Sequence, residues 1–172
     1  AEAKALSNQI VEDAKNKALA ERQAWPYAWM KNRLYPLAAQ RGDVTGKLVV
    51  KDPHYPQSWA MGAWVGLAQP LSCGLHWQNQ GREYQFWTRA DYRNGSFKIQ
   101  NVRPGKYTLY AFTDGIMGEY VKDDINVEAG KTLDLGNLLW VPQRFGRQLW
   151  QLGNPDRTAR EFRHGDDYRK WG

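Results

Sequence analysis

The sequence predicts a mainly β fold, an antiparallel two-sheet β-sandwich preceded by an N-terminal α-helix. About seven short segments between residues 41 and 141 alternate apolar and polar side chains, as strands with one buried face do. Turns rich in glycine, proline and asparagine separate these segments. The first 24 residues instead have the composition of a helix. About seven strands in roughly a hundred residues is the usual size of a two-sheet sandwich.

The N-terminal segment is expected to form an amphipathic helix. Residues 1–24 are rich in Ala, Glu and Lys and contain neither Gly nor Pro, and Leu6, Ile10 and Ala14 recur at helical spacing. Pro26 should end the helix, because the residue before a proline is pushed out of helical geometry. Residues 27–40 follow as an aromatic, proline-containing connector, which we expect to pack against a neighbouring surface.

The strands are placed by apolar runs and by the turns between them. They are expected at residues 44–50, 63–68, 84–90, 96–100, 107–112, 125–128 and 132–135. The Asn94-Gly95 pair is a strong hairpin signal, because both residues tolerate positive φ. In residues 107–112 both alternating sets of side chains are largely apolar or aromatic, which predicts a strand covered on both faces.

The composition excludes several classes of protein. The net charge of +6 permits an anionic partner, such as a phosphate backbone or a polyuronate, without choosing between them. The basic residues are scattered among acids and form no helical stripe, which disfavours a nucleic-acid partner. The single Cys73 excludes an internal disulfide. No apolar run approaches the roughly 20 residues needed to cross a bilayer, so no membrane segment is expected.

No residue pattern indicates catalysis or metal binding. His54, His76 and His164 are widely spaced, and with one cysteine a Cys/His zinc site is not expected. The sequence has neither a phosphate-binding glycine loop nor a nucleophile-elbow motif. Cys73, close to His76, is interpreted as a buried or loop thiol rather than as half of a catalytic dyad. We therefore expect no metal and no cofactor, and assign no catalytic residue.

The most concentrated candidate site is the aromatic and basic segment 84–91, with Trp77 just upstream. On a strand, Trp87 and Arg89 share one side, so the indole could stack on a sugar ring while the guanidinium pairs with a uronate carboxylate. Trp77, Trp87 and Arg89 are accordingly the candidate carbohydrate-binding residues. The competing interpretation is that Trp87 packs beneath a loop or a neighbouring domain, as large aromatic residues usually do.

Five segments, in order, carry a family resemblance. They are residues 25–27 (WPY), 40–46 (QRGDVTG), 84–91 (YQFWTRAD), 101–111 (NVRPGKYTLYA) and 149–159 (LWQLGNPDRTA). Together they resemble rhamnogalacturonan lyases of polysaccharide lyase family 4. The resemblance implies a secreted, three-domain enzyme that cleaves the rhamnose–galacturonate link of the pectin backbone by β-elimination.

The resemblance also implies a division of the chain. Residues 41–141 would form the family's central sandwich, of fibronectin type III or immunoglobulin-like fold. Residues 1–40 would be the end of the catalytic region with its connector. Residues 142–172 would begin a truncated C-terminal carbohydrate-binding jelly-roll domain. The catalytic lysine and histidine of the family belong to an N-terminal domain that no segment here matches.

The leading hypothesis is therefore the non-catalytic central portion of a rhamnogalacturonan endolyase, acting as a scaffold and a polysaccharide contact. Its expected partners are pectic polysaccharide and the missing catalytic and C-terminal domains of the same enzyme. An autonomous carbohydrate-binding module for acidic pectic polysaccharide is the alternative, and a self-sufficient small lyase is a third hypothesis. Secretion is expected from the resemblance, although the chain begins without a signal peptide.

Overall fold

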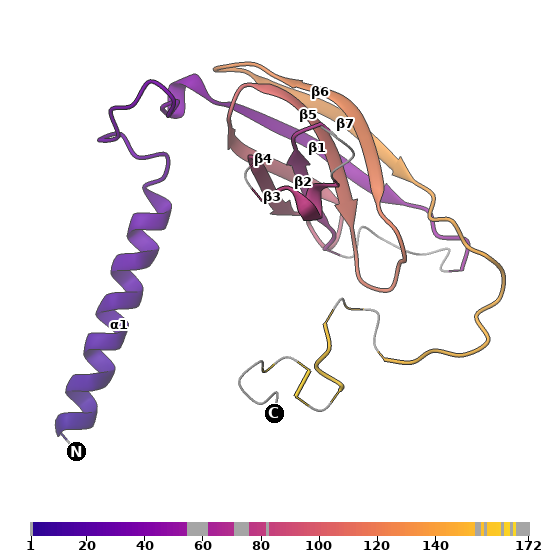
Figure 1. Ribbon diagram of the computed structural model, residues 1–172, viewed down its shortest axis with the longest axis horizontal. Helices are drawn as coiled ribbons and strands as arrows, with labels where there is room; N and C mark the ends of the chain where they lie inside the picture. The colour runs from indigo at the N-terminus through magenta and orange to yellow at the C-terminus, as the bar shows by residue number, and fades with distance from the viewer. Residues whose placement is uncertain are drawn as a thin grey trace.

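The computed structural model describes residues 2–54, 62–70, 76–81, 83–153, 156, 158–162, 164–165 and 167 (Figure 1). In chain order its elements are α1 (Glu2–Gln23), η1 (Ala38–Gln40), β1 (Gly42–Val50), β2 (Trp64–Ala68), η2 (Trp77–Asn79), β3 (Gln85–Arg89), β4 (Ser96–Val102), β5 (Gly105–Phe112), β6 (Tyr120–Val127) and β7 (Thr132–Trp140). The two η elements are single 3-10 turns. Every expected strand is present. β6 begins earlier and β7 ends later than the apolar alternation indicated.

The strands form two sheets that face each other, which confirms the predicted sandwich (Figure 1). One sheet has the order β4-β1-β7 and the other has the order β3-β2-β5-β6. Their pairs are antiparallel apart from β1 and β7, which run parallel with Leu48 opposite Leu138. The sequence could not indicate this parallel pair, because inward and outward alternation is the same for both strand directions.

The turn at Asn94-Gly95 is present, but the hairpin prediction is wrong. The Asp91 side chain accepts hydrogen bonds from the backbone N–H groups of Arg93 and Asn94, and Gly95 has φ 75°. The flanking strands belong to different sheets, since β3 pairs with β2 whereas β4 pairs with β1. The turn therefore carries the chain from one sheet to the other. Local sequence sets the turn geometry, but burial of the apolar faces chooses the strand partners.

The core lies between the two sheets and is apolar. Val44 and Leu48 of β1 and Leu67 of β2 are at most 1% exposed. β5 is buried on both faces, as predicted. Leu109 belongs to the core between the sheets, and Tyr110 is equally buried on the outer face. Something must therefore cover the outer face of the β3-β2-β5-β6 sheet.

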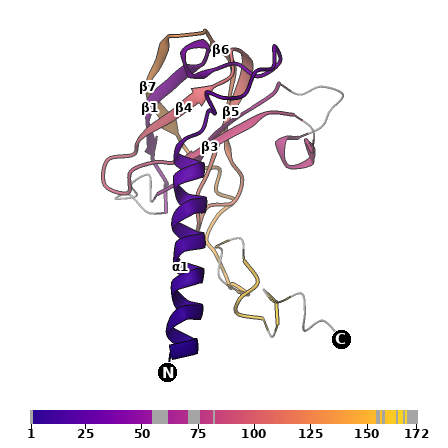
Figure 2. The same cartoon turned by 90° about the vertical axis from the view of Figure 1, so that its left-hand side faces the viewer.

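The helix α1 runs away from the sandwich as a separate rod (Figure 2). It is present as predicted, but its apolar side chains are not buried in the described part of the chain: Leu6 and Ile10 are each 61% exposed. Beyond β7 the described residues form no further strand or helix. Among the described residues, no helix has the length and hydropathy needed to cross a membrane.

Candidate functional site

The outer face of the β3-β2-β5-β6 sheet carries the residues that the sequence singled out. Its strand register produces two adjacent rows: Trp64 with Arg89 and Phe112, then Gly66 with Trp87 and Tyr110. Because side chains two positions apart on a strand share a face, the two rows form one surface. Aromatic rings from three strands are thus gathered over the sheet.

Trp87 lies flat over the position where β2 has no side chain. A Cβ atom added to Gly66 would overlap the Trp87 ring at Cε3, Cδ2 and Cζ3. The indole Nε1 of Trp87 donates a hydrogen bond of 3.0 Å to Gln85 Oε1, two residues earlier on the same strand. Gly66 therefore provides the floor on which Trp87 rests, and the ring is fixed in one orientation.

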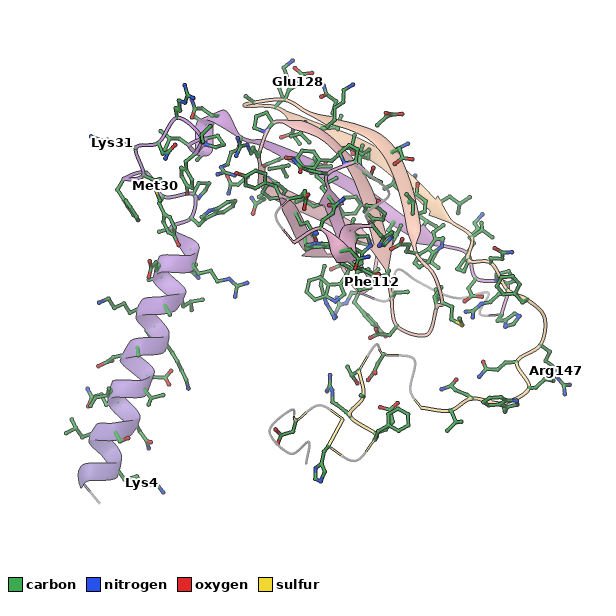
Figure 3. The ribbon with its side chains drawn as sticks, in the orientation of Figure 1. Lys4, Met30, Lys31, Phe112, Glu128 and Arg147 are labelled. Carbon is green, nitrogen blue, oxygen red and sulfur yellow. The ribbon has the colours of Figure 1, made fainter. Side chains whose placement is uncertain are left out.

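Trp77, on η2, covers Trp87 from outside the sheet. Its ring centroid lies 4.6 Å from that of Trp87 and 5.6 Å from that of Phe112, with the Phe112 ring only 4° from parallel. Phe112, labelled in Figure 3, is the last residue of β5. The Nε1 of Trp77 donates a hydrogen bond of 2.8 Å to Glu119 Oε2, and His76 Nε2 contacts the other oxygen of the same carboxylate. We call Trp77, Trp87, Tyr110 and Phe112 the outer aromatic cluster. Glu119 therefore fixes the position of Trp77 over Trp87.

Arg89 does not join Trp87. Its guanidinium carbon lies 4.6 Å above the ring of Trp64, its cross-strand partner, and the Trp64 side chain is 38% exposed. The structure therefore brings Trp77 and Trp87 into contact and places Arg89 at the exposed end of the same face. The carbohydrate-binding role of these three residues stays a prediction. The packing of Trp87 beneath η2 matches the competing interpretation of this residue.

A cavity of about 420 Å³ opens beside the cluster. It is lined by His76, Trp77, Gln78, Phe112, Gly118 and Glu119. Burial, and then the charge of Glu119, raise the pKa of the Tyr110 phenol above its ordinary value. The same negative charge would repel a ligand carboxylate. This cavity is therefore better matched to a neutral group than to a uronate.

A second feature joins the connector to the sandwich. Arg41, just before β1, is only 7% exposed, and its guanidinium carbon lies 4.7 Å over the ring of Trp25 and 5.2 Å over that of Tyr35. Arg41 Nε donates to the carbonyl of Pro36 at 2.8 Å, and one Nη donates to the carbonyl of Asn101 at 3.1 Å. The connector thus packs against its neighbour, as the sequence indicated, with a buried cation between them.

A third feature attaches the segment after β7. The carboxylate of Asp52, whose side chain is 1% exposed, is held by Arg144 through both oxygens. The hydrogen bonds from Arg144 hold the pKa of Asp52 below its ordinary value. Arg144 lies 92 residues away from Asp52 in the sequence. The pair therefore links the end of β1 to the chain that follows the sandwich.

Sequence reasoning missed Glu119, Arg41 and the Asp52–Arg144 pair. Each depends on a partner far along the chain: Glu119 lies 42 residues from Trp77, and the Arg41 bond to Asn101 spans 60 residues. Local spacing carries no signal for such pairs. The one available indication was the strand predicted at 107–112, both of whose faces were expected to be buried. A segment outside the sheet had to cover its outer face, and apolar periodicity did not identify that segment.

Among the described residues, no group of three or more His, Cys, Asp or Glu side chains is placed to hold a metal ion. Glu119, the acidic residue beside the cluster, instead accepts a hydrogen bond from the Trp77 indole N–H and contacts His76 Nε2. In chemical terms the site offers aromatic surfaces, a carboxylate and, at its edge, a guanidinium. This is the chemistry of a packing surface or of sugar contact.

Comparison with known proteins gives a consistent family. Residues 60–135 match the family model described as polysaccharide lyase family 4, domain II. The chain is 44% identical over 138 residues to the probable rhamnogalacturonate lyase B of Aspergillus fumigatus, covering 76% of this chain and 19% of that protein. It is 34% identical over 165 residues to the rhamnogalacturonate lyase of Dickeya dadantii, covering 95% of this chain and 26% of that protein.

The chain thus spans only about a fifth to a quarter of the length of these relatives. A cohesin–X-dockerin complex from Acetivibrio cellulolyticus is a distant structural match, with 17% identity, a TM-score of 0.37 and coverage of 57% of this chain and 56% of that one. The family model, a fibronectin type III-like domain, agrees with the two-sheet fold described above. The chain belongs to polysaccharide lyase family 4, of which it carries domain II.

Proposed function

We propose that this chain is the non-catalytic central portion of a rhamnogalacturonan endolyase, serving as a scaffold between a catalytic domain and a C-terminal carbohydrate-binding domain. The whole enzyme would be secreted and would cleave the rhamnogalacturonan I backbone of pectin by β-elimination. One observation carries the proposal. Both segments that flank the sandwich are attached to it through an arginine, yet each leaves its own apolar side chains exposed.

On the N-terminal side the attachment is Arg41, and the exposed apolar side chains are those of the helix and connector. Leu6 and Ile10 are 61% exposed, Leu34 is 63% exposed and Trp29 is 69% exposed. Neighbouring apolar side chains that remain exposed are typical of surfaces that bind other protein domains. This supports assigning residues 1–40 to the end of a catalytic region.

On the C-terminal side the attachment is Arg144, and four apolar side chains within the next eight residues are exposed. They are Phe145, Leu149, Trp150 and Leu152, each at least 76% exposed. A segment of this composition gains stability only when another surface covers it. This supports residues 142–172 as the beginning of a further domain, with the sandwich at 41–141 between the two.

The proposal is tested by exchanging the corresponding region of the Dickeya dadantii relative for this chain. We expect the chimera to retain lyase activity, measured as ultraviolet absorbance of the unsaturated product, because a scaffold needs only the correct fold and contacts. This chain alone should give no unsaturated product. Product from the chain alone would contradict a non-catalytic role, and a folded but inactive chimera would contradict the scaffold role.

The exposed Arg89–Trp64 pair favours one second candidate, an autonomous carbohydrate-binding module for acidic pectic polysaccharide that uses Trp77, Trp87 and Arg89. Trp87→Ala is a poor test, because Trp87 packs between Gly66 and Trp77. Arg89→Gln is sharper, since Arg89 is exposed. Retardation of the chain in gels containing rhamnogalacturonan should be lost in Arg89→Gln and kept in Arg93→Gln, which changes an exposed turn arginine, if the module exists.

A further inference from the structure

A separate cavity lies between the connector and the sandwich and is lined by two arginines. It measures about 360 Å³, and its wall includes Trp25, Tyr35, Arg41, Tyr84 and Arg103. Ligand pockets usually enclose about 300–1,000 Å³, so this cavity lies within that range. None of these five residues belongs to the outer aromatic cluster, so the two sites are distinct.

The guanidinium of Arg41 has donors to spare. Arginine carries five N–H donors, and the bonds to Pro36 and Asn101 occupy one on Nε and one on Nη1. Within the described part of the chain its other contacts are with the faces of two aromatic rings. A nearly buried cation is usually paired with an acid. Here no described carboxylate is bonded to it.

Arg103 is the second cation of the cavity. Its guanidinium carbon lies 4.5 Å over the ring of Tyr84, and its carbonyl accepts a 2.7 Å hydrogen bond from the buried Tyr107 hydroxyl. That bond fixes the backbone of the turn between β4 and β5, so the backbone from which the Arg103 side chain extends is held in place. No carboxylate of the described residues forms an ion pair with Arg103 either.

The two cations are close enough to repel each other. Burial is the main reason why the pKa of Arg41 lies below its ordinary value, and the charge of Arg103 lowers it further. A bound anion would relieve both effects, since opposite charge favours the ionised guanidinium. Planar carboxylates suit this role, because arginine binds them with two parallel hydrogen bonds.

We propose that this cavity binds the carboxylate of a galacturonate residue in an acidic polysaccharide. The rings of Trp25 and Tyr84, which are 36% and 48% exposed, supply apolar faces beside the guanidinium groups, the combination that a charged sugar ring requires. The choice of a sugar acid over another anion rests on the proposed function in pectin degradation. The site itself rests on the cavity and on two arginines that have no carboxylate partner within the part of the chain that the structure describes.

The test is a titration of the 172-residue chain with an oligosaccharide of alternating rhamnose and galacturonate, followed by NMR. We expect saturable shifts of backbone amide signals centred on Arg41, Asn101 and Arg103. The carboxyl-reduced form of the same oligosaccharide should produce none, because it keeps the sugar rings and loses the charge. Saturable shifts centred elsewhere, equal binding of the reduced form, or no shifts at all would overturn the proposal.

Two pairs of variants locate the site. Arg103→Gln should weaken binding about tenfold or more, as the loss of a charge-assisted hydrogen bond does, and Tyr84→Ala should weaken it by removing the ring beneath that guanidinium. Arg93→Gln removes the same charge from an exposed turn and should leave the affinity unchanged, whereas Arg89→Gln tests the competing site on the outer face. Loss in Arg89→Gln alone would place the sugar on the outer face instead. Equal loss in all the arginine variants would indicate diffuse charge attraction, and both results would overturn the proposal.

A glutamate-rich peptide serves as the competing anion. If it binds at Arg103 and the oligosaccharide does not, the cavity accepts a protein carboxylate and the sugar proposal is wrong. Urea unfolding of each variant shows whether it remains folded, and Arg103→Gln should, since its side chain lies outside the core. The titration measures binding and the chimera measures turnover, so an active chimera without oligosaccharide binding would reject this site while leaving the scaffold role intact.

Discussion

At the scale of single residues, the outer aromatic cluster depends on a side chain that is absent. Gly66 is buried in β2, and the space above it is filled by Trp87, which is in turn covered by Trp77. The Trp87 ring cannot easily move away from Gly66, because its Nε1 donates a hydrogen bond to Gln85 and the Trp77 ring lies over it. A glycine inside a strand normally weakens it, and here it marks the close approach of another group.

We therefore expect Gly66→Ala to destabilise the sandwich by about 1–3 kcal/mol, the usual cost of overpacking a filled site. Urea unfolding followed by tryptophan fluorescence measures this change. Gly81→Ala is the matched control, because a Cβ there would meet no atom within 4 Å. It should leave the free energy of unfolding nearly unchanged. Equal stability of the two variants would mean that Trp87 does not rest on Gly66.

Glu119, beside the cluster, is the second decisive residue, since it accepts a hydrogen bond from Trp77 and contacts His76. Glu119→Ala should lower the free energy of unfolding by about 1–3 kcal/mol, because it leaves polar groups beneath η2 unpaired. The Trp77 indole N–H should also exchange faster with solvent. Glu128→Ala removes a carboxylate whose pair with Lys131 is exposed, and should cost less than about 0.5 kcal/mol. An unchanged exchange rate in Glu119→Ala would contradict the role of this carboxylate.

At the scale of elements, the strands could be predicted from sequence and their partners could not. The alternation in residues 96–100 and 132–135 identified β4 and β7 because each buries one face only. Whether two strands pair depends on contacts far along the chain, so the parallel β1–β7 pair and the crossing at Asn94-Gly95 carried no local signal. The candidate site divides in the same way. Trp77 and Trp87 were visible as aromatics, whereas Glu119 became visible only when β6 was placed beside β5.

The Asp52–Arg144 pair is the contact that attaches the C-terminal segment to β1. We expect Asp52→Asn to lower the free energy of unfolding by about 2 kcal/mol at pH 7, less than for a fully buried pair because Arg144 is 18% exposed. Arg144→Gln should lower the free energy of unfolding by more, since it leaves the more deeply buried charge, that of Asp52, without its partner. Asp13→Asn, on the exposed face of α1, is the control and should leave the free energy of unfolding unchanged.

The same pair predicts a pH dependence. The pKa of Asp52 is lower in the folded protein than in the unfolded chain, where an aspartate titrates near about 3.9. Its contribution is therefore complete above that pH and is lost as the pH falls through the lower, folded value. The difference in unfolding free energy between the wild-type chain and Asp52→Asn should narrow below about pH 4. A difference that stays constant down to pH 2 would show that the carboxylate is not held by Arg144 in solution.

At the scale of the whole molecule, the chain is a two-sheet sandwich with one long helix extending from it. The 22 residues of α1 extend for about 33 Å at 1.5 Å per residue, away from the strands (Figure 2). The contact that joins the N-terminal region to the sandwich is made by Trp25, just before the connector, and by Tyr35 within it, both around Arg41, and not by the apolar residues of the helix. The contact that stabilises the sandwich and the helix that we propose adjoins a neighbouring domain therefore lie in different parts of the first 40 residues.

This division predicts that two N-terminal deletions differ sharply. Removing residues 1–22 should leave the unfolding midpoint of the sandwich unchanged while abolishing the helical signal in circular dichroism, because Leu6, Ile10 and Leu19 are each more than half exposed and lie outside the core. Removing residues 1–36 also takes away the rings and the carbonyl that surround Arg41, and should lower the free energy of unfolding by about 1–3 kcal/mol. If the shorter deletion destabilised the sandwich as much as the longer one, α1 would have to pack on the sheets in solution. Its apolar stripe would then be an internal contact of this chain and not a surface kept for a second domain.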